Sequence, residues 1–145
     1  MKTTLQLPVD HVYKDGRNCT SCGVFKLASE YTLERDDRSK GGVAMRSKCK
    51  PCNEHIKWKA FIQRTYGITA EEYYDMLAAQ DNKCAICESE EVNSSRVSSG
   101  KLFIDHCHDT GKVRGLLCSK CNHSIGLLND DVNLLRKAID YLTNS

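Results

Sequence analysis

Eight of the nine cysteines stand in four CxxC pairs, and this spacing constrains the chain more than any other feature of its sequence. The pairs are Cys19/Cys22, Cys49/Cys52, Cys84/Cys87 and Cys118/Cys121. Two such pairs supply the four thiolates of one structural zinc site, so four pairs predict two structural Zn²⁺ sites. A chain of 145 residues with three Phe and one Trp has thin cores if it is divided into two small modules. Bound zinc offsets that deficit with roughly 10–16 kcal/mol per site.

An even set of cysteines also fits disulfides or a redox enzyme, and the rest of the sequence argues against both. Residues 1–10 contain no long apolar run of the kind that opens a secretory signal. The chain also lacks a stretch of about 18 consecutive apolar residues, so we expect no membrane span. Repeated CxxC pairs in a reducing compartment are typical of metal binding. We therefore expect a cytoplasmic, zinc-binding protein.

Charge is distributed unevenly along the chain, although the formal net charge is only +2. Between residues 35 and 64 there are nine Lys/Arg and three Asp/Glu, whereas residues 71–91 carry seven Asp/Glu and one Lys. This asymmetry, beside a zinc module, favours a basic face that meets DNA phosphates over a merely solvated surface. The candidate DNA contacts in this stretch are Arg46, Lys48, Lys50, Lys57, Lys59 and Arg64.

The first half of the chain predicts a loose arm, a zinc module and two helices. Residues 1–17 are expected to form the flexible arm, and 18–66 the zinc module with its basic helix. That helix is expected from about residue 52 to 66, ended by a glycine, with one side formed by Ile56, Ala60 and Gln63. A capping box formed by Thr69 and Glu72 predicts a second helix from 70 to about 80. Its apolar stripe comprises Tyr73, Met76 and Leu77.

The second half predicts a strand–turn–strand–helix unit between the last two cysteine pairs. The expected elements are a strand at 102–104, a turn at 109–112, a strand at 113–118, a short helix from 119 and a final helix at 130–142. The final helix is amphipathic and could either close the core or pair with a second copy. We therefore predict a small α+β protein whose residues 67–145 form a zinc-stabilised ββα domain with a C-terminal helix.

An Asp-His pair and an asparagine fall at the two ends of this ββα unit. Asp105 and His106 end the first strand, and Asn122 lies in the first turn of the helix. Carboxylate and amide oxygens are ligands that suit Mg²⁺, for which Mn²⁺ or another divalent cation can substitute. A histidine ionises near neutral pH and can take a proton from water. The constellation predicts a one-metal nuclease in which His106 is the general base.

Other polar residues around this site have open roles. His108 could orient a phosphate or protonate the leaving group, and Lys112 and Arg114 are candidate contacts to flanking phosphates. One of the histidines could instead replace a cysteine at zinc, and a role for His123 beside the asparagine stays open. Cys107 alternates with the histidines along the strand, which favours a place in the core over a role as nucleophile.

At these residues the chain resembles the recombination endonuclease VII branch of the HNH (ββα-metal, His-Me finger) nucleases of bacteriophages. The match extends from Tyr66 to Leu128 and includes Tyr66-Gly-Ile-Thr, Gln80, Cys84-Ala-Ile-Cys87, Ile104-Asp-His-Cys-His-Asp-Thr-Gly-Lys-Val-Arg-Gly-Leu-Leu-Cys118 and Cys121-Asn122. The resemblance implies zinc ligands at the last four paired cysteines, metal ligands at Asp105 and Asn122, a general base at His106 and an auxiliary histidine at His108. The short C-terminal segment and the added N-terminal zinc module depart from the branch's junction-resolving member.

Three functions compete on this basis. The favoured one is a Mg²⁺-dependent endonuclease that nicks or cuts duplex DNA, acting as a monomer or homodimer in the cytoplasm, which is that of the host cell if a phage encodes it. A narrower alternative is a Holliday-junction or branched-DNA resolvase. The alternative of another class is a non-catalytic zinc-finger module that binds nucleic acid.

Overall fold

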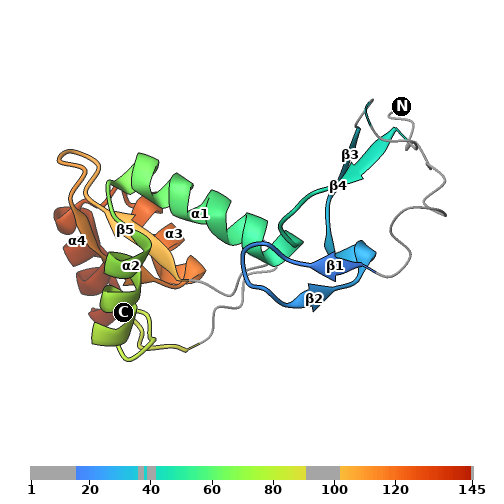
Figure 1. Ribbon diagram of the computed structural model, residues 1–145. Helices are drawn as coiled ribbons and strands as arrows, with labels where there is room; N and C mark the ends of the chain where they lie inside the picture. The colour runs from blue at the N-terminus through green and yellow to red at the C-terminus, as the bar shows by residue number, and fades with distance from the viewer. Residues whose placement is uncertain (1–15, 36–37, 39–41, 91–101, 145) are drawn as a thin grey trace. The chain divides into compact units, whose positions relative to one another are not determined.

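The computed structural model describes residues 16–35, 38, 42–90 and 102–144. These residues form two compact units, which divide between Ala60 and Phe61. The predicted arm, apart from its last two residues, lies outside the described residues, as do residues 91–101. Figure 1 shows the elements of both units, which are described separately below.

The first unit consists of two short antiparallel sheets. Strand β1 (Arg17–Asn18) pairs with β2 (Phe25–Lys26), and a single 3₁₀ turn, η1 (Ala28–Glu30), follows. Strand β3 (Leu33–Arg35) then pairs with β4 (Val43–Met45). The turn between β1 and β2 carries the first CxxC pair. It closes with Gly23 at φ 73°, a left-handed conformation that glycine adopts without a steric penalty.

Paired cysteines occupy the centre of this unit. Its buried cluster comprises Cys19, Tyr31, Met45 and Cys49, with Ala28 and Cys52 packed against it. The Tyr31 hydroxyl donates to the Arg17 carbonyl at 2.8 Å, which satisfies the ring's polar end inside the cluster. So small an apolar centre is typical of domains that a structural metal stabilises.

Helix α1 (Lys50–Tyr66) begins two residues before the predicted start. The side formed by Ile56, Ala60 and Gln63 is exposed, and the buried residue of this helix is Ile62. Gly67 ends the helix as predicted: its φ is 71°, and its N–H donates to the Gln63 carbonyl at 3.1 Å.

Helix α2 (Ala70–Ala79) opens with the predicted capping box. The Thr69 hydroxyl accepts the Glu72 N–H at 3.2 Å, and the Glu72 carboxylate accepts the Thr69 N–H at 2.7 Å. Tyr73, the first residue of the predicted stripe, is buried, and its hydroxyl donates to the Leu102 carbonyl at 3.0 Å. Met76 and Leu77 are half-buried on the same helix.

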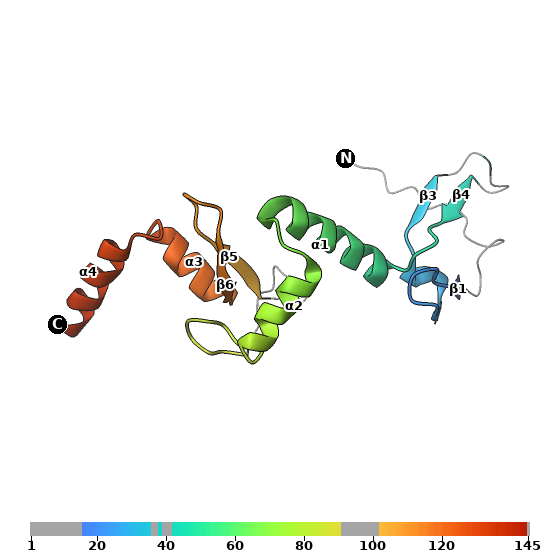
Figure 2. The ribbon, with the colours of Figure 1, turned by 60° about the vertical axis from the view of Figure 1, so that its left-hand side comes forward.

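The predicted ββα unit is confirmed. Strand β5 (Phe103–His106) pairs antiparallel with β6 (Val113–Leu117), and α3 (Ser119–Leu127) packs against both strands (Figure 2). The first strand ends at His106. His108 was expected in an extended strand and instead lies in the turn that follows. Leu116 and Leu117 are both buried and point to opposite faces of the strand, so this end of the hairpin is covered on both faces.

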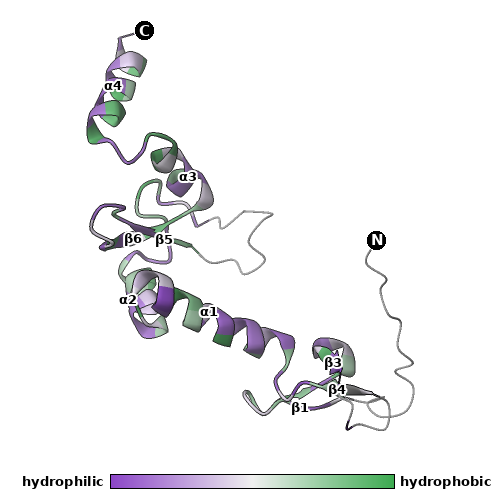
Figure 3. Cartoon of the chain, turned by 90° about the horizontal axis from the view of Figure 1, so that it is seen from above, coloured by the Kyte–Doolittle hydropathy of each residue, from purple (hydrophilic) through white to green (hydrophobic). Residues whose placement is uncertain are grey.

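Helix α4 (Val132–Thr143) follows a tight turn, and Asp131 caps it by accepting the N–H groups of Asn133 and Leu134. None of its residues is buried, and most of its apolar side chains are exposed, with Leu142 at 73%. Figure 3 shows alternating hydrophobic and polar positions along α4, which extends away from the hairpin. The option that this helix closes the core is therefore not realised among the described residues. No helix in those ranges is long and apolar enough to cross a membrane.

Candidate active site and cysteine clusters

The eight paired cysteines gather into two clusters of four. Within each cluster all four sulfur atoms lie within 4.8 Å of one another. Tetrahedral zinc with Zn–S bonds of about 2.3 Å requires sulfurs separated by about 3.8 Å. The Cys87 and Cys118 sulfurs are 3.7 Å apart, which matches that requirement. Neither cluster contains a histidine, so both fit all-cysteine zinc sites.

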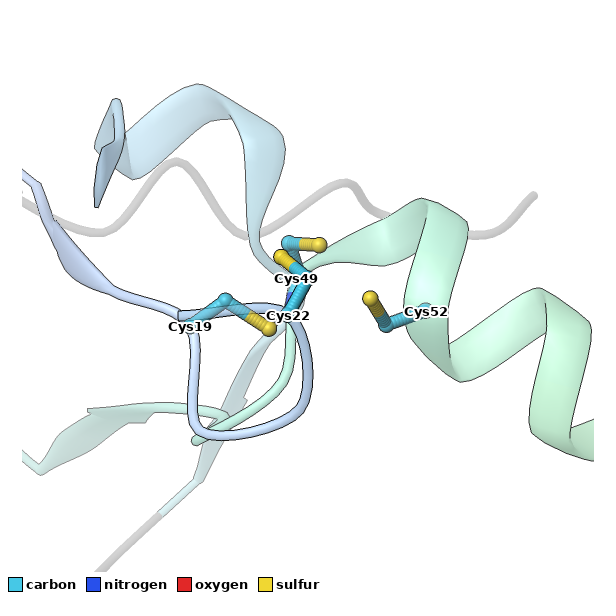
Figure 4. Close-up of side chains that lie close together, drawn as sticks. All are labelled: Cys19, Cys22, Cys49 and Cys52. Carbon is cyan, nitrogen blue, oxygen red and sulfur yellow. Dashed lines mark hydrogen bonds between the residues drawn. The ribbon is translucent and has the colours of Figure 1, made fainter. Parts of the chain in front are cut away.

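The first cluster joins the β1–β2 turn to the start of α1. Figure 4 shows Cys19 and Cys22 on the turn, and Cys49 and Cys52 at the helix start, with their sulfurs converging. The N–H groups of Cys49 and Ser21 point at the Cys19 sulfur, at 3.3 and 3.4 Å. Backbone N–H donors, that of Cys49 first, lower the pKa of Cys19 to about 6. These donors favour the thiolate that zinc binds.

The second cluster fixes the hairpin to α3. Cys118 ends the hairpin and caps the helix, where its sulfur accepts the Cys121 N–H at 3.4 Å. Burial raises the pKa of Cys84, but N–H donors from Cys87, Cys118 and Ile86 outweigh it and bring the value to about 6. Burial, and then the neighbouring thiols, raise the pKa of Cys121. One thiol of the cluster therefore loses its proton easily. The others do so only when a bound cation compensates the added negative charge.

The predicted nuclease residues line one pocket of about 360 Å³ in the second unit. Its lining comprises Tyr66, Ile104, Asp105, His106, His108, Asn122, His123, Gly126, Leu127 and Asp130. The structure therefore brings together the aspartate, both histidines of the Asp-His-Cys-His segment and the asparagine. Tyr66, Leu127 and Asp130 were missed as site residues at the sequence level.

Arg114 forms a fork on Asp105. Its Nε donates to Oδ2 at 2.6 Å and its Nη2 to Oδ1 at 2.9 Å, while the carboxylate is largely buried. The hairpin register shifts after Asp105: it pairs with Gly115, whereas His106 pairs with Val113. Arg114 is the extra residue of this β-bulge. A bulge re-aims side chains, which brings the guanidinium to the face of the carboxylate.

The guanidinium also reaches a second carboxylate. Nη2 of Arg114 donates to Asp130 Oδ2 at 2.9 Å, and the same oxygen lies 3.4 Å from His108 Nδ1. Hydrogen bonds to Asp105, and then to Asp130, raise the pKa of Arg114 above its already high ordinary value, so it stays charged. Arg114 was predicted to contact flanking phosphates, and in this structure it is held at the pocket by two acids.

His106 stands between two aromatic rings. Its ring centroid is 5.2 Å from that of Tyr66 and 5.0 Å from that of His108, and both contacts are edge-to-face. These contacts limit the rotation of the imidazole. Cys107, expected in the core, is only half-buried, and a hydrogen bond from the Thr110 side chain lowers its pKa. The turn after His106 re-aims this thiol, so the strand alternation used to place it no longer applies.

Oxygen donors in the pocket fit a hard divalent cation. Asp105 supplies a carboxylate and Asn122 an amide oxygen from the first turn of α3, and both line the same pocket. Two protein oxygens with room for water and a phosphate are what Mg²⁺ requires. Because Arg114 holds both oxygens of Asp105, a cation has to share this carboxylate with the guanidinium or displace it.

Two of the predicted DNA contacts in the first unit have protein partners. Lys50 Nζ donates to the Ser29 carbonyl at 2.7 Å, and Arg46 pairs with Glu34 through Nε at 3.0 Å and Nη2 at 2.9 Å. The remaining basic residues of α1 named above are exposed. Their role on DNA stays a prediction.

Comparison with known proteins identifies the family. The sequence profile described as recombination endonuclease VII matches residues 59–144, more than half of the chain. The chain belongs to the recombination endonuclease VII family. It is 40% identical over 129 residues to the gene 59 protein of Mycobacterium phage L5, covering 87% of this chain and 73% of that protein. It is 37% identical over 127 residues to the gene 59 protein of Mycobacterium phage D29, covering 86% of this chain and 72% of that protein.

A solved structure is also similar in part. The crystal structure of the ββα-Me type II restriction endonuclease Hpy99I aligns with 90% of this chain and 69% of its own, at 24% identity and a TM-score of 0.34. The family assignment confirms the predicted membership. The protein is an endonuclease VII-family nuclease, a phosphodiester hydrolase of small α+β ββα-metal fold with two four-cysteine clusters, and its family implies a DNA substrate.

Proposed function

We propose that this nuclease is a Mg²⁺-dependent endonuclease that hydrolyses phosphodiester bonds in duplex DNA, by nicking or by cutting both strands. The observation that carries the proposal is the meeting of Asp105, His106 and Asn122 in one pocket of the zinc-held ββα unit. A protein that only binds DNA has no need of a carboxylate, an imidazole and an amide at one point. The pocket is partly open, so a backbone phosphate can reach it.

Each residue has a definite task in this reaction. Asp105 and Asn122 hold the cation, which when bound stabilises negative charge on the phosphate. His106, restrained by the rings of Tyr66 and His108, takes a proton from the attacking water. His108 faces the same pocket and orients the phosphate or returns a proton to the leaving oxygen. Arg114 offers positive charge beside the scissile phosphate.

The first zinc module would anchor the substrate. In this proposal, residues 18–66 hold DNA phosphates and residues 67–145 cut. The anchoring side chains are Arg46, Lys48, Lys50, Lys57, Lys59 and Arg64, with Lys112 and Arg114 on the nuclease hairpin. Contacts to phosphates are blind to sequence and strongly salt-dependent.

The proposal is tested by separating DNA binding from cleavage. Wild type, His106→Ala and Asn122→Ala are compared on linear duplex and on a four-way junction, with binding measured in buffer without Mg²⁺. We expect His106→Ala to bind normally and to cleave roughly 10²–10⁴-fold more slowly, the usual contribution of a general base. Asn122→Ala should also need more Mg²⁺. Lys137→Ala is the control, because Lys137 is exposed on α4 and does not line the pocket. Normal cleavage by His106→Ala would remove it as the base, and cleavage of the junction alone would favour the resolvase.

A further inference from the structure

The turn between α3 and α4 delivers a carboxylate to the active site. Asn129 and Asp130 both have positive φ, 53° and 55°, and the Asp130 N–H donates to the Ile125 carbonyl at 3.0 Å. Two successive left-handed residues that are not glycine are uncommon, and Asn and Asp are the side chains that tolerate this conformation best. The turn reverses the chain so that the Asp130 carboxylate lines the catalytic pocket, 14% exposed.

This carboxylate touches two groups that the reaction uses. Its Oδ2 accepts from Arg114 Nη2 at 2.9 Å and lies 3.4 Å from Nδ1 of His108. Arg114 donates from Nε to Asp105 and from Nη2 to both Asp105 and Asp130. Nη1, the remaining nitrogen of the fork, still has two N–H groups for a phosphate. His108 is 65% exposed, and its ring contacts Asp130 on one hand and the His106 ring on the other.

We propose that Asp130 is a positioning residue of this nuclease. It orients His108 by accepting from Nδ1, which leaves Nε2 for the phosphate, and it holds the Arg114 guanidinium beside Asp105. The inference rests on the proposed function, in which His108 and Arg114 act on the scissile phosphate. A carboxylate behind a histidine selects the tautomer and orientation of the ring, and a second anchor fixes a long side chain that one ion pair leaves mobile.

The neighbouring aspartate supplies a matched control. Asp131 caps α4 by accepting two backbone N–H groups, and it does not line the pocket. Glycine is an acceptable N-cap, so Asp131→Gly removes one carboxylate at little cost to the helix. Asp130→Gly removes the other, and glycine suits a φ of 55°. The two variants thus differ by one position and in whether the lost carboxylate faces the active site.

The test uses the full-length, zinc-loaded protein. We expect single-turnover cleavage by Asp130→Gly to fall roughly 10–100-fold, as for other residues that orient site groups, with DNA affinity in Mg²⁺-free buffer and zinc content unchanged. Asp131→Gly should match wild type, and Asp130→Asn, which keeps an acceptor, should recover part of the rate. ¹⁵N NMR of His108, at a pH where the ring is neutral, should show Nδ1 protonated in wild type and Nε2 protonated in Asp130→Gly.

Several results would overturn the proposal. Equal rates for the two glycine variants would show that the carboxylate does not serve the reaction. Loss of zinc by Asp130→Gly would assign it a structural role. If wild type cleaves no DNA, the proposed function fails, and the NMR comparison still decides the contact: an unchanged His108 tautomer in Asp130→Gly would refute the orienting role, and a changed one would support it.

Discussion

The Gln80 side chain hydrogen-bonds to the backbone of β6 at the outer edge of the catalytic hairpin. Truncating this side chain should lower the stability of the hairpin by a measurable amount. Its side-chain Nε2 donates to the carbonyls of Leu116 and Lys83 at 2.9 and 2.8 Å. Its Oε1 accepts the Leu116 N–H at 2.9 Å. The Gln80 side-chain amide therefore makes the hydrogen bonds to β6 that the backbone of a third strand would make. Gly115 makes this approach possible, since a Cβ there would lie 3.1 Å from the Gln80 oxygen.

The cost of Gln80→Ala follows from what each backbone group loses. Leu116 is fully buried, so its N–H is left without a partner, which costs about 1–3 kcal/mol. Its carbonyl keeps the Ala85 N–H at 3.1 Å, and the half-buried Lys83 carbonyl can turn to water, so these two losses add about 1 kcal/mol together. The hairpin should therefore be destabilised by about 2–4 kcal/mol.

The rate of amide hydrogen exchange at Leu116 measures this local loss of stability, and the measurement does not require the zinc modules to unfold. A loss of about 2–4 kcal/mol corresponds to exchange faster by roughly 30–700-fold. Gln63→Ala on α1 is the control, because the Gln63 side chain is exposed. Exchange that rises less than about threefold over this control would refute the assignment of Gln80 as the anchor of β6.

Three further outcomes are expected. Cys118→Ser should leave one zinc ion per chain instead of two and unfold the ββα unit, whereas Cys107→Ser should keep both, as measured by native mass spectrometry. Zinc affinity should fall steadily between about pH 8 and 6, because protons compete for the thiolates; affinity independent of pH would exclude thiolate ligation. Lys57→Ala with Lys59→Ala should reduce the slope of log binding constant against log salt by about 1.8, and Lys137→Ala on α4 should not; an unchanged slope would place the α1 lysines away from DNA.

Local patterns in the sequence were sufficient for the metal clusters and for the central pocket residues. CxxC spacing fixes which sulfurs can converge, and a strand–turn–strand–helix between two pairs forces Asp105 and Asn122 toward each other. The capping box at Thr69 could also be predicted from the sequence, because its two partners are only three residues apart. Interactions of this kind depend on short-range geometry that few alternatives can satisfy.

Features that depend on tertiary geometry could not be predicted from the sequence. Regular alternation along the second strand directs Arg114 away from the face of Asp105, and only the β-bulge reverses this. Asp130 lies 25 positions after Asp105, and its arrival in the pocket depends on a left-handed turn that no hydrophobic period indicates. Burial of Ile62 was not predicted, because this residue falls in the second unit, while the first three turns of α1, up to Ala60, belong to the first.

The most direct test of the account is a supercoiled-plasmid assay with the zinc-loaded protein. Wild type with Mg²⁺, wild type in buffer without Mg²⁺ and His106→Ala with Mg²⁺ are incubated with the plasmid and separated on a gel. The account predicts open-circular or linear DNA from the first sample only, with linear product marking paired cuts. Equal conversion in all three would contradict metal-dependent catalysis at His106. A plasmid that stays supercoiled in all three would contradict cleavage of ordinary duplex.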